Sequence, residues 1–167
     1  MRYEYSPFEV VGRYTGRAPV NLEAIARDLN LPVDYTDLGE GIAGHILKDR
    51  QRSPRSGFFI RINSTQHSNR QRFTLAHEIA HFILHRDLIE SGLVDDTMYR
   101  SEISGHYETQ ANRMAVDIIM PRALVKQEAR KGHSDEVLAR MFGVSLAAMS
   151  IRLEGIKATG DQAELQI

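Results

Sequence analysis

The most regular alternation of apolar and polar positions runs from Arg70 to His85. Apolar residues recur there at every third or fourth position, which is the period of a helix with one buried face. The predicted stripe consists of Phe73, Ala76, Ile79, Ala80, Ile83 and Leu84. Ser68 and Gln71 have the spacing of a capping box before it, and Ser91-Gly92 lies beyond its end. We therefore expect one long amphipathic helix in the middle of the chain.

A second helical pattern extends from about His106 to Met120 and is stopped by Pro121. Its apolar stripe contains Ala111, Met114, Ala115, Ile118 and Ile119. Glu108 precedes Ala111 by three positions, so the pattern predicts that this carboxylate faces inward as well. A carboxylate that enters a core needs a proton, a cation or a metal ion.

The flanking patterns are shorter. A helix is expected over Val20–Leu31, with Asn21 as its N-cap, and the polar sequence from Asp87 to Gly105 is expected to be a loop. Short strands are predicted at Val33–Tyr35, Gly41–Leu47 and Phe58–Asn63. Because the last of these is the strongest strand pattern, Phe59, Ile60, Arg61, Ile62 and Asn63 are candidates for an edge that pairs with an extended substrate, although a purely structural strand fits equally well.

Near the C-terminus, the sequence from Ser134 to Leu153 resembles a helix-turn-helix unit with its turn at Gly143. A DNA-reading second helix would use Ser145, Ser150 and Arg152. That helix is rich in alanine, and positions 122–157 hold only seven basic residues against four acidic ones. We therefore favour packing on the other helices or contact with a partner protein over direct DNA binding.

The candidate chemistry lies in the central helix, where His77-Glu78-Ile79-Ala80-His81 forms the motif HExxH. Residues at i and i+4 lie one turn apart on the same helix face, so both imidazoles can converge on one tetrahedral zinc ion. Glu78 lies beside His77 and can take a proton from an attacking water and later deliver it to a leaving amine. Such a short motif also arises by chance on amphipathic helices. Whether it forms a metal site therefore depends on the presence of a third ligand.

Glu108 is the predicted third ligand, because its inward position on the second helix completes a His₂Glu set. Asp95, Asp96 and Glu102 are competing oxygen donors in loop-like sequence. The longer motif HExxHxxGxxH is excluded, because its glycine and third histidine positions hold Leu84 and Asp87.

Four further residues have candidate supporting roles. Asn112 could accept the distal N–H of a ligand histidine and fix its tautomer. His106 and Tyr107 could donate to the oxyanion that forms on attack, or simply cap the start of a helix. His85 continues the histidine row by one more turn, and we interpret it as a packing or C-terminal histidine.

Composition narrows the function classes only a little. A chain of 167 residues with 42% hydrophobic residues is long enough for one domain, or one domain with a small appendage. The net charge of −1 gives no general attraction to nucleic acid or to membranes. The absence of cysteine excludes disulfides, thiol nucleophiles and cysteine zinc sites, and fits a cytoplasmic location. The sequence has neither a signal-peptide pattern nor an apolar stretch of membrane-spanning length.

These motifs together resemble the ImmA/IrrE family of metallopeptidases. The resemblance rests on RFTLAHEIAHFILH, on Glu108-x-x-Ala111-Asn112 and on Ile118-Ile119-Met120-Pro121, and it covers Phe58–Pro121 closely. Arg113-Met114 and Val116-Asp117 depart from the more apolar run usual in the family, which affects packing and not the ligands. The resemblance implies a Zn²⁺ ion held by His77, His81 and Glu108, with Glu78 as general base.

The resemblance also implies a substrate, because members of the family inactivate a cognate helix-turn-helix repressor, usually encoded nearby, in mobile elements and stress responses. We therefore expect a zinc endopeptidase of the short, ImmA-like form that cuts a repressor or antitoxin. The alternative is a regulator that binds the repressor or DNA without cleavage. The expected fold is α+β and zincin-like, with a small antiparallel or mixed sheet packed on the HExxH helices. The expected divisions are a peptidase domain (1–122), a helix-turn-helix-like unit (123–157) and a flexible tail (158–167).

Overall fold

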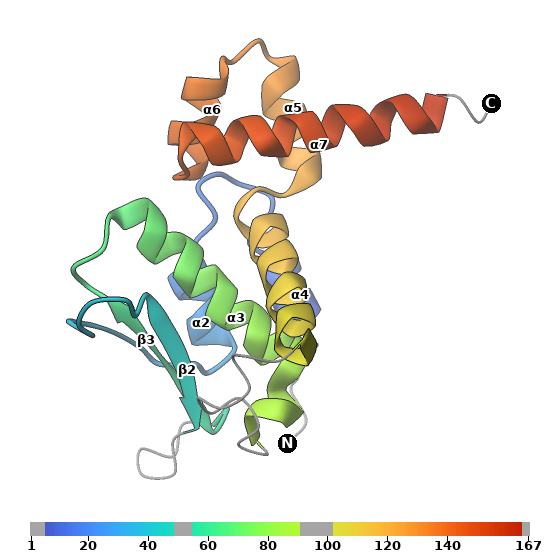
Figure 1. Ribbon diagram of the computed structural model, residues 1–167. Helices are drawn as coiled ribbons and strands as arrows, with labels where there is room; N and C mark the ends of the chain where they lie inside the picture. Colours follow the sequence, from blue (N-terminus) through green and yellow to red (C-terminus); the bar gives the residue numbers. More distant parts are fainter. Residues whose placement is uncertain (1–5, 49–54, 91–101, 165–167) are drawn as a thin grey trace.

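The computed structural model describes residues 6–48, 55–90 and 102–164, which form a three-stranded sheet and seven helices (Figure 1). The fold class is α+β, as the sequence predicts. The strands are β1 (Val33–Thr36), β2 (Gly44–Lys48) and β3 (Phe58–Asn63). The helices are α1 (Pro7–Gly12), α2 (Leu22–Asp28), α3 (Ser68–Glu90), α4 (Glu102–Ile119), α5 (Arg122–Arg130), α6 (Asp135–Phe142) and α7 (Leu146–Glu164). Asn21 caps α2 as expected, because its side chain accepts the Ala24 N–H.

The sheet is mixed and has the strand order β1-β3-β2. β1 runs parallel to β3 and β2 runs antiparallel to it, so Ile60 of β3 lies opposite both Val33 and Ile46. The prediction that β3 offers an edge to a substrate is therefore wrong. The apolar run of β3 is the signature of a strand that is buried on both faces, and all of its residues except Arg61 are buried.

Helix α3 lies against β2 and β3 and packs side by side with α4 (Figure 1). The capping box predicted at its start is not formed. The ring of His67 accepts the Asn69 N–H instead, and the Gln71 amide donates to the carbonyls of Ser64 and Gln66. His85 leaves the helical conformation (φ −128°, ψ 23°), so α3 bends there before its last turn.

The apolar stripe predicted for α3 is only partly buried. Ala76, Ile79 and Ala80 are in the core, whereas Phe73 and Leu84 are 38% and 39% exposed. The stripe predicted for α4 is confirmed, with Met114 at its margin. Helical structure also extends further than predicted, to Glu90 in α3 and from Glu102 in α4, because packing between the two helices supplements weak local preference. Residues 91–101, including the competing donors Asp95 and Asp96, lie outside the described residues.

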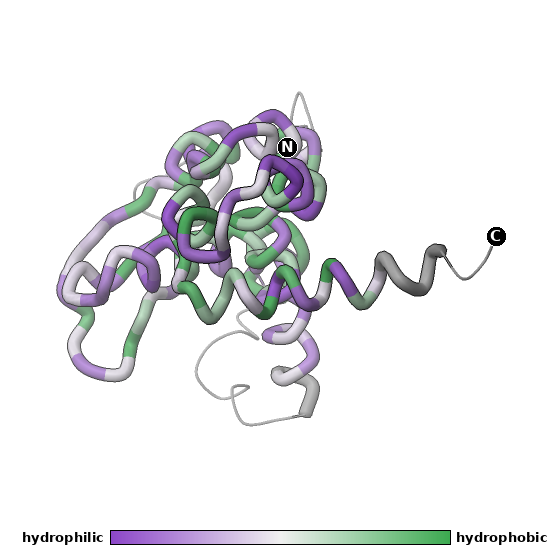
Figure 2. Tube along the Cα trace, turned by 90° about the horizontal axis from the view of Figure 1, so that it is seen from above, coloured by the Kyte–Doolittle hydropathy of each residue, from purple (hydrophilic) through white to green (hydrophobic). Residues whose placement is uncertain are grey.

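Helices α5, α6 and α7 pack together beyond the ends of α3 and α4, and the far half of α7 extends away from the body (Figures 1 and 2). Gly143 makes the turn between α6 and α7 with a left-handed backbone (φ 66°), as its residue type predicts. Leu138, Phe142 and Met149 are buried in the same apolar cluster as the sheet and α3. The core is therefore continuous across position 122.

No helix among the described residues is both long enough and apolar enough to cross a membrane.

Candidate metal centre

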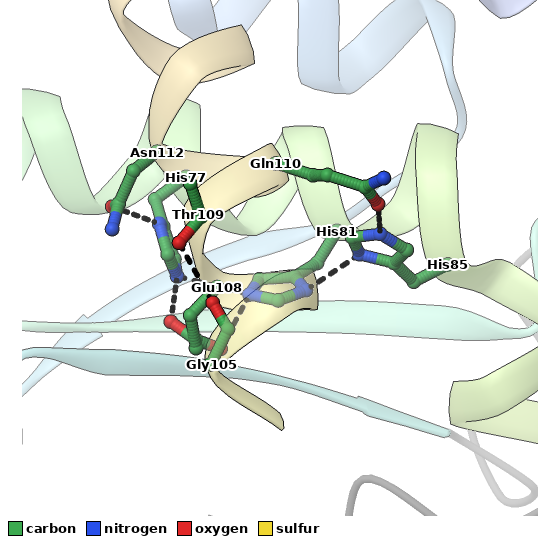
Figure 3. A network of polar contacts seen from close by, with 8 residues as sticks. All are labelled: His77, His81, His85, Gly105, Glu108, Thr109, Gln110 and Asn112. Carbon is green, nitrogen blue, oxygen red and sulfur yellow. Dashed lines mark hydrogen bonds and ion pairs between the residues drawn. The ribbon is translucent and has the colours of Figure 1, made fainter. Parts of the chain in front are cut away.

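Helix α3 presents three histidines in one row, because His77, His81 and His85 follow one another at intervals of four residues. The ring centroids of His77 and His81 lie 4.5 Å apart, and those of His81 and His85 lie 5.2 Å apart. Glu108 reaches this row from α4 (Figure 3). The inward direction predicted for Glu108 is therefore observed.

The donor atoms of His77, His81 and Glu108 converge on one point. The Nε2 atoms of the two histidines are 3.0 Å apart, and the carboxylate oxygens of Glu108 lie 3.2 Å from that of His77 and 3.0 Å from that of His81. Tetrahedral zinc with bonds of about 2.0–2.1 Å holds its ligand atoms about 3.3–3.4 Å apart. Electron-rich atoms this close repel one another unless a proton or a cation lies among them. The three residues therefore fit a small divalent cation.

Hydrogen bonds on the far side of each ligand ring set the tautomer that a metal requires (Figure 3). His77 Nδ1 lies 3.0 Å from the Asn112 Oδ1, which can only accept, so Nδ1 carries the proton and Nε2 keeps its lone pair. His81 Nδ1 lies 3.1 Å from His85 Nδ1, and His85 Nε2 lies 2.9 Å from Gln110 Oε1.

The same reasoning applies along this second chain of contacts. Because the Gln110 oxygen accepts from His85 Nε2, His85 Nδ1 is free to accept the proton on His81 Nδ1. Burial lowers the pKa of His85, which favours the neutral ring that this arrangement needs. His81 Nε2 is then left with its lone pair facing Glu108.

Glu78 is buried beside the donor cluster and lies against strand β2. The Asn63 N–H donates to the Ala43 carbonyl at 2.8 Å. The backbone N–H and C=O groups of residues 43, 45 and 47 therefore point toward β3, and those of residues 44, 46 and 48 point away from it, toward the open edge. The outward N–H of Ile46 donates to the Glu78 carboxylate. Burial, opposed by His77 and reinforced by the charge of Glu108, raises the pKa of Glu78 to about 7. This is the pKa expected of a group that exchanges protons near neutral pH.

Protons stabilise the site when no metal is bound. Hydrogen bonds from His77 and His81 hold the pKa of Glu108 well below its usual range. Burial alone would lower the pKa of His77, but the hydrogen bond to Glu108 and the charges of Glu78 and Glu108 outweigh burial and raise it. A metal ion would displace these protons, as it does at sites built from histidine and carboxylate.

Comparison with known proteins agrees with this geometry. The family model of the IrrE N-terminal-like domain, Peptidase_M78, matches residues 26–154, a range that contains all three donors and Glu78. The chain belongs to this family. The resemblance to ImmA/IrrE metallopeptidases seen in the sequence is thereby confirmed.

Two known proteins are similar to this chain, one in sequence and one in fold. The radiation response metalloprotease IrrE of Deinococcus radiodurans is 33% identical over 115 residues, which cover 65% of this chain and 35% of that protein. The chain thus spans about a third of the length of that curated relative. A solved structure of a Mycobacterium tuberculosis transcriptional regulator superposes with a TM-score of 0.55 at 18% identity, covering 88% of this chain and 45% of that one, which is a likeness of fold.

The other predicted site residues lie further from the donor cluster. His106 Nε2 is 2.9 Å from the Gln110 Nε2, and the Tyr107 ring packs edge-on against His85 with centroids 4.9 Å apart. Both residues therefore support the His85–Gln110 side of the site, and their role as oxyanion donors stays a prediction. In β3, the side chain of Asn63 stabilises the loop before β2 by donating to the carbonyls of Gly39 and Ile42.

The residues proposed to read DNA on α7 have other partners. Arg152 donates to the Met120 carbonyl and to Asp117, with distances of 2.8 Å and 2.6 Å from its Nη2 atom, so it fastens α7 to the end of α4. The Ser150 hydroxyl donates to Asp135, and the Ser145 hydroxyl accepts the Ala148 N–H at the start of α7. These contacts explain the three side chains as structural groups.

Sequence reasoning missed two parts of the site. The sequence gives no signal for Gln110, because a glutamine two positions after Glu108 meets His85 only once α3 and α4 are paired. For His85 the sequence predicts a packing or C-terminal role, although its place four positions after His81 is a usable signal for contact with that ring. Strand β2 was predicted, but nothing in the sequence indicated that it, and not β3, would lie at the edge beside Glu78.

Proposed function

We propose that this chain is a zinc-dependent endopeptidase with a zincin-like site. The observation that carries the proposal is the convergence of His77 Nε2, His81 Nε2 and the Glu108 carboxylate beside a buried Glu78. His77, His81 and Glu108 would hold the zinc ion, which supplies Lewis-acid activation of water and of the scissile carbonyl when bound.

Glu78 acts as the general base in this proposal. Its pKa of about 7 lets it hold a proton taken from the attacking water and release that proton to the leaving amine. The Ile46 N–H fixes the carboxylate in place during both transfers. Asn112, together with His85 and Gln110, keeps the ligand rings in the orientation that leaves each Nε2 lone pair available.

The edge of β2 replaces β3 as the proposed guide for an extended substrate. β2 is an outer strand of the described sheet, and its outward positions Gly44, Ile46 and Lys48 lie on the side where Glu78 lies. A substrate strand laid along this edge would pair through its backbone while its side chains remain free to select sequence.

The proposed physiological substrate is a helix-turn-helix repressor or antitoxin, cut at one or a few sites. This part rests on membership of the ImmA/IrrE family and not on any contact in the structure. The name of the Deinococcus relative, a radiation response metalloprotease, agrees with a role in a stress response. Direct DNA binding finds no support in the contacts of Ser145, Ser150 and Arg152.

The test is incubation of the zinc-loaded protein with a purified candidate repressor, followed by intact-mass analysis. Glu78→Gln keeps the size of the side chain and removes the base, so we expect the cleavage rate to fall by a factor of about 10²–10⁴. Glu108→Ala and His81→Ala should lose zinc as well as activity. Undiminished cleavage by Glu78→Gln, or wild-type protein that binds no zinc on reconstitution, would contradict the proposal.

A further inference from the structure

An apolar groove begins one helical turn from the metal ligands. It has a volume of about 710 Å³ and lies between the first turns of α3, the last turns of α4 and helix α7. This volume is within the range of about 300–1,000 Å³ usual for ligand sites. Its apolar lining includes Phe73, Val116, Ile119, Met120, Ala148 and Ile151.

The groove lies one helical turn from the candidate metal centre along both α3 and α4. Phe73 lines the groove, and its ring centroid lies 6.2 Å from that of His77. On α4, Val116 follows Asn112 by one turn, and Asn112 contacts His77. An extended chain advances about 3.3 Å per residue, so a peptide that passes the metal would enter the groove about two residues later.

Two large apolar side chains that line the groove are open to solvent. Ile151 is 70% exposed and Phe73 is 38% exposed. Large apolar side chains gathered in one exposed depression mark a binding surface more often than chance. Neither side chain contributes to the buried core, which is filled on these two helices by neighbours such as Met149 and Ala76.

The charges around the groove have one sign. Arg70, Arg122 and Arg152 line it, and no carboxylate does among the described residues. Asp117 offsets the charge of Arg152. Arg122 donates to the Ile156 carbonyl, a neutral group, and Arg70 is exposed at the start of α3. A bound group of negative charge would therefore be favoured here.

We infer that this groove is a specificity site for the protein substrate, and that it binds an apolar side chain with a neighbouring Asp or Glu located about two or more residues from the bond that is cut. The inference rests on the proposed peptidase function for its link to cleavage. The apolar lining holds the side chain, and Arg70 and Arg122 attract the carboxylate. Affinity for the substrate thus depends on residues remote from the reacting atoms.

The first test measures binding without cleavage. The zinc-loaded Glu78→Gln protein is titrated into a dye-labelled decapeptide that alternates leucine and glutamate, with fluorescence polarisation as readout. A decapeptide that alternates leucine and lysine is the matched probe. We expect the glutamate peptide to bind about three- to tenfold more tightly, the factor that one or two exposed ion pairs provide.

Variants then separate the groove from the rest of the surface. Arg70→Glu should abolish or reverse the preference for the glutamate peptide, and Ile151→Glu should weaken binding of that peptide further. Arg130→Glu changes another exposed arginine, which lies on α5 outside the groove, and should leave the preference unchanged. Equal affinity for the two peptides, or a preference unchanged by Arg70→Glu, would overturn the inference. So would tight binding of laurate without binding of either peptide, because it would assign the groove to a small amphiphile.

The second test uses cleavage. In a randomised decapeptide mixture, the wild-type protein should favour Asp or Glu beside an apolar residue at a position at least about two residues from the cut. Arg70→Glu should shift that preference toward Lys or Arg without moving the cut. If the protein cleaves and its sequence preference is unchanged by Arg70→Glu, the groove site alone is overturned. If the glutamate peptide binds more tightly as expected but no substrate is cleaved, the proposed peptidase activity is overturned and the groove remains a peptide-binding site.

Discussion

At the scale of single residues, the metal centre depends on side chains that do not themselves touch the metal position. Asn112 orients His77, and the pair His85 and Gln110 orients His81. Each partner decides which ring nitrogen carries the proton, and that choice leaves the donor nitrogen available. The three candidate ligands are therefore only part of this site.

Gln110→Leu tests this support. It removes the oxygen that accepts from His85 Nε2, so His85 and then His81 lose their fixed orientation. We expect zinc affinity to fall by about 10–100-fold, measured by competition with a chromogenic chelator. Gln110→Glu restores an acceptor and should recover most of the affinity. Thr109→Val changes an exposed neighbour on α4 and serves as control. An affinity for zinc that Gln110→Leu leaves intact would show that His85 needs no orienting partner.

Glu78 gives the metal-free protein a characteristic pH dependence. Its pKa rises from about 4.5 in the unfolded chain to about 7 in the folded one, so the folded state binds the extra proton between these values. Stability then falls as pH rises through this window, because the unfolded state releases that proton first. In the Glu78→Gln variant, the fall in the free energy of unfolding across this pH window should be smaller by about 1–3 kcal/mol. Urea unfolding in EDTA at pH 5 and pH 8 measures it; a fall of equal size in wild type and variant would show that Glu78 is not responsible.

At the scale of elements, the site depends on how closely β2 approaches α3. A Cβ atom on Gly44 would lie 2.6 Å from Thr74 Cγ2 and 2.7 Å from the Arg61 carbonyl oxygen. Only glycine therefore allows β2 to come near enough for the Ile46 N–H to reach Glu78. Helix α4 contributes the other half of the site by facing Glu108 and Asn112 toward the same row of histidines.

Gly44→Ala should push β2 away from α3. We expect a loss of about 1–3 kcal/mol in the free energy of unfolding, as for other overpacked positions, together with slower catalysis because Glu78 loses its anchor. Gly12→Ala is the matched control, since a Cβ atom there meets nothing within 4 Å. Urea unfolding and a cleavage assay measure the two effects. A variant with wild-type stability would show that β2 can shift without cost.

At the scale of the whole molecule, one apolar cluster joins the sheet, the α3–α4 pair and the three C-terminal helices. Arg152 adds polar contacts between α7 and the end of α4. Arg72 links the start of α3 to the Val20 carbonyl, and its side chain passes close to Gly143. Such continuity favours unfolding as a single cooperative unit, although the sequence suggests a division near position 122.

Phe142→Ala tests this expectation, because Phe142 is fully buried in α6, on the far side of that division from the metal ligands. The substitution should lower stability by about 3–5 kcal/mol. Loss of far-UV circular dichroism and release of zinc should then occur at the same, lower temperature. Leu146→Ala, at a position that is 44% exposed, should have little effect. Zinc release at the wild-type temperature after Phe142→Ala would instead identify residues 123–157 as a separately folding unit.

The sequence by itself determined the parts of this protein that depend on short separations. The helical period placed His77, Glu78 and His81 on one face of α3, and it turned Glu108 inward on α4, because residues three and four apart share a helix face. Gly143 and Pro121 marked where helices end, since their backbone requirements are local. Membership of the ImmA/IrrE family followed from the same short motifs.

Only the tertiary structure decided which strand became the edge, which residues orient His81, and where a groove opens beside the site. β2 meets Glu78 across 32 positions of sequence, and Gln110 meets His85 across 25. Phe73 belongs to the predicted apolar stripe yet remains exposed, because α7 leaves a gap beside it instead of covering it. Contacts over such separations are chosen by the packing of whole elements, which local periodicity does not encode.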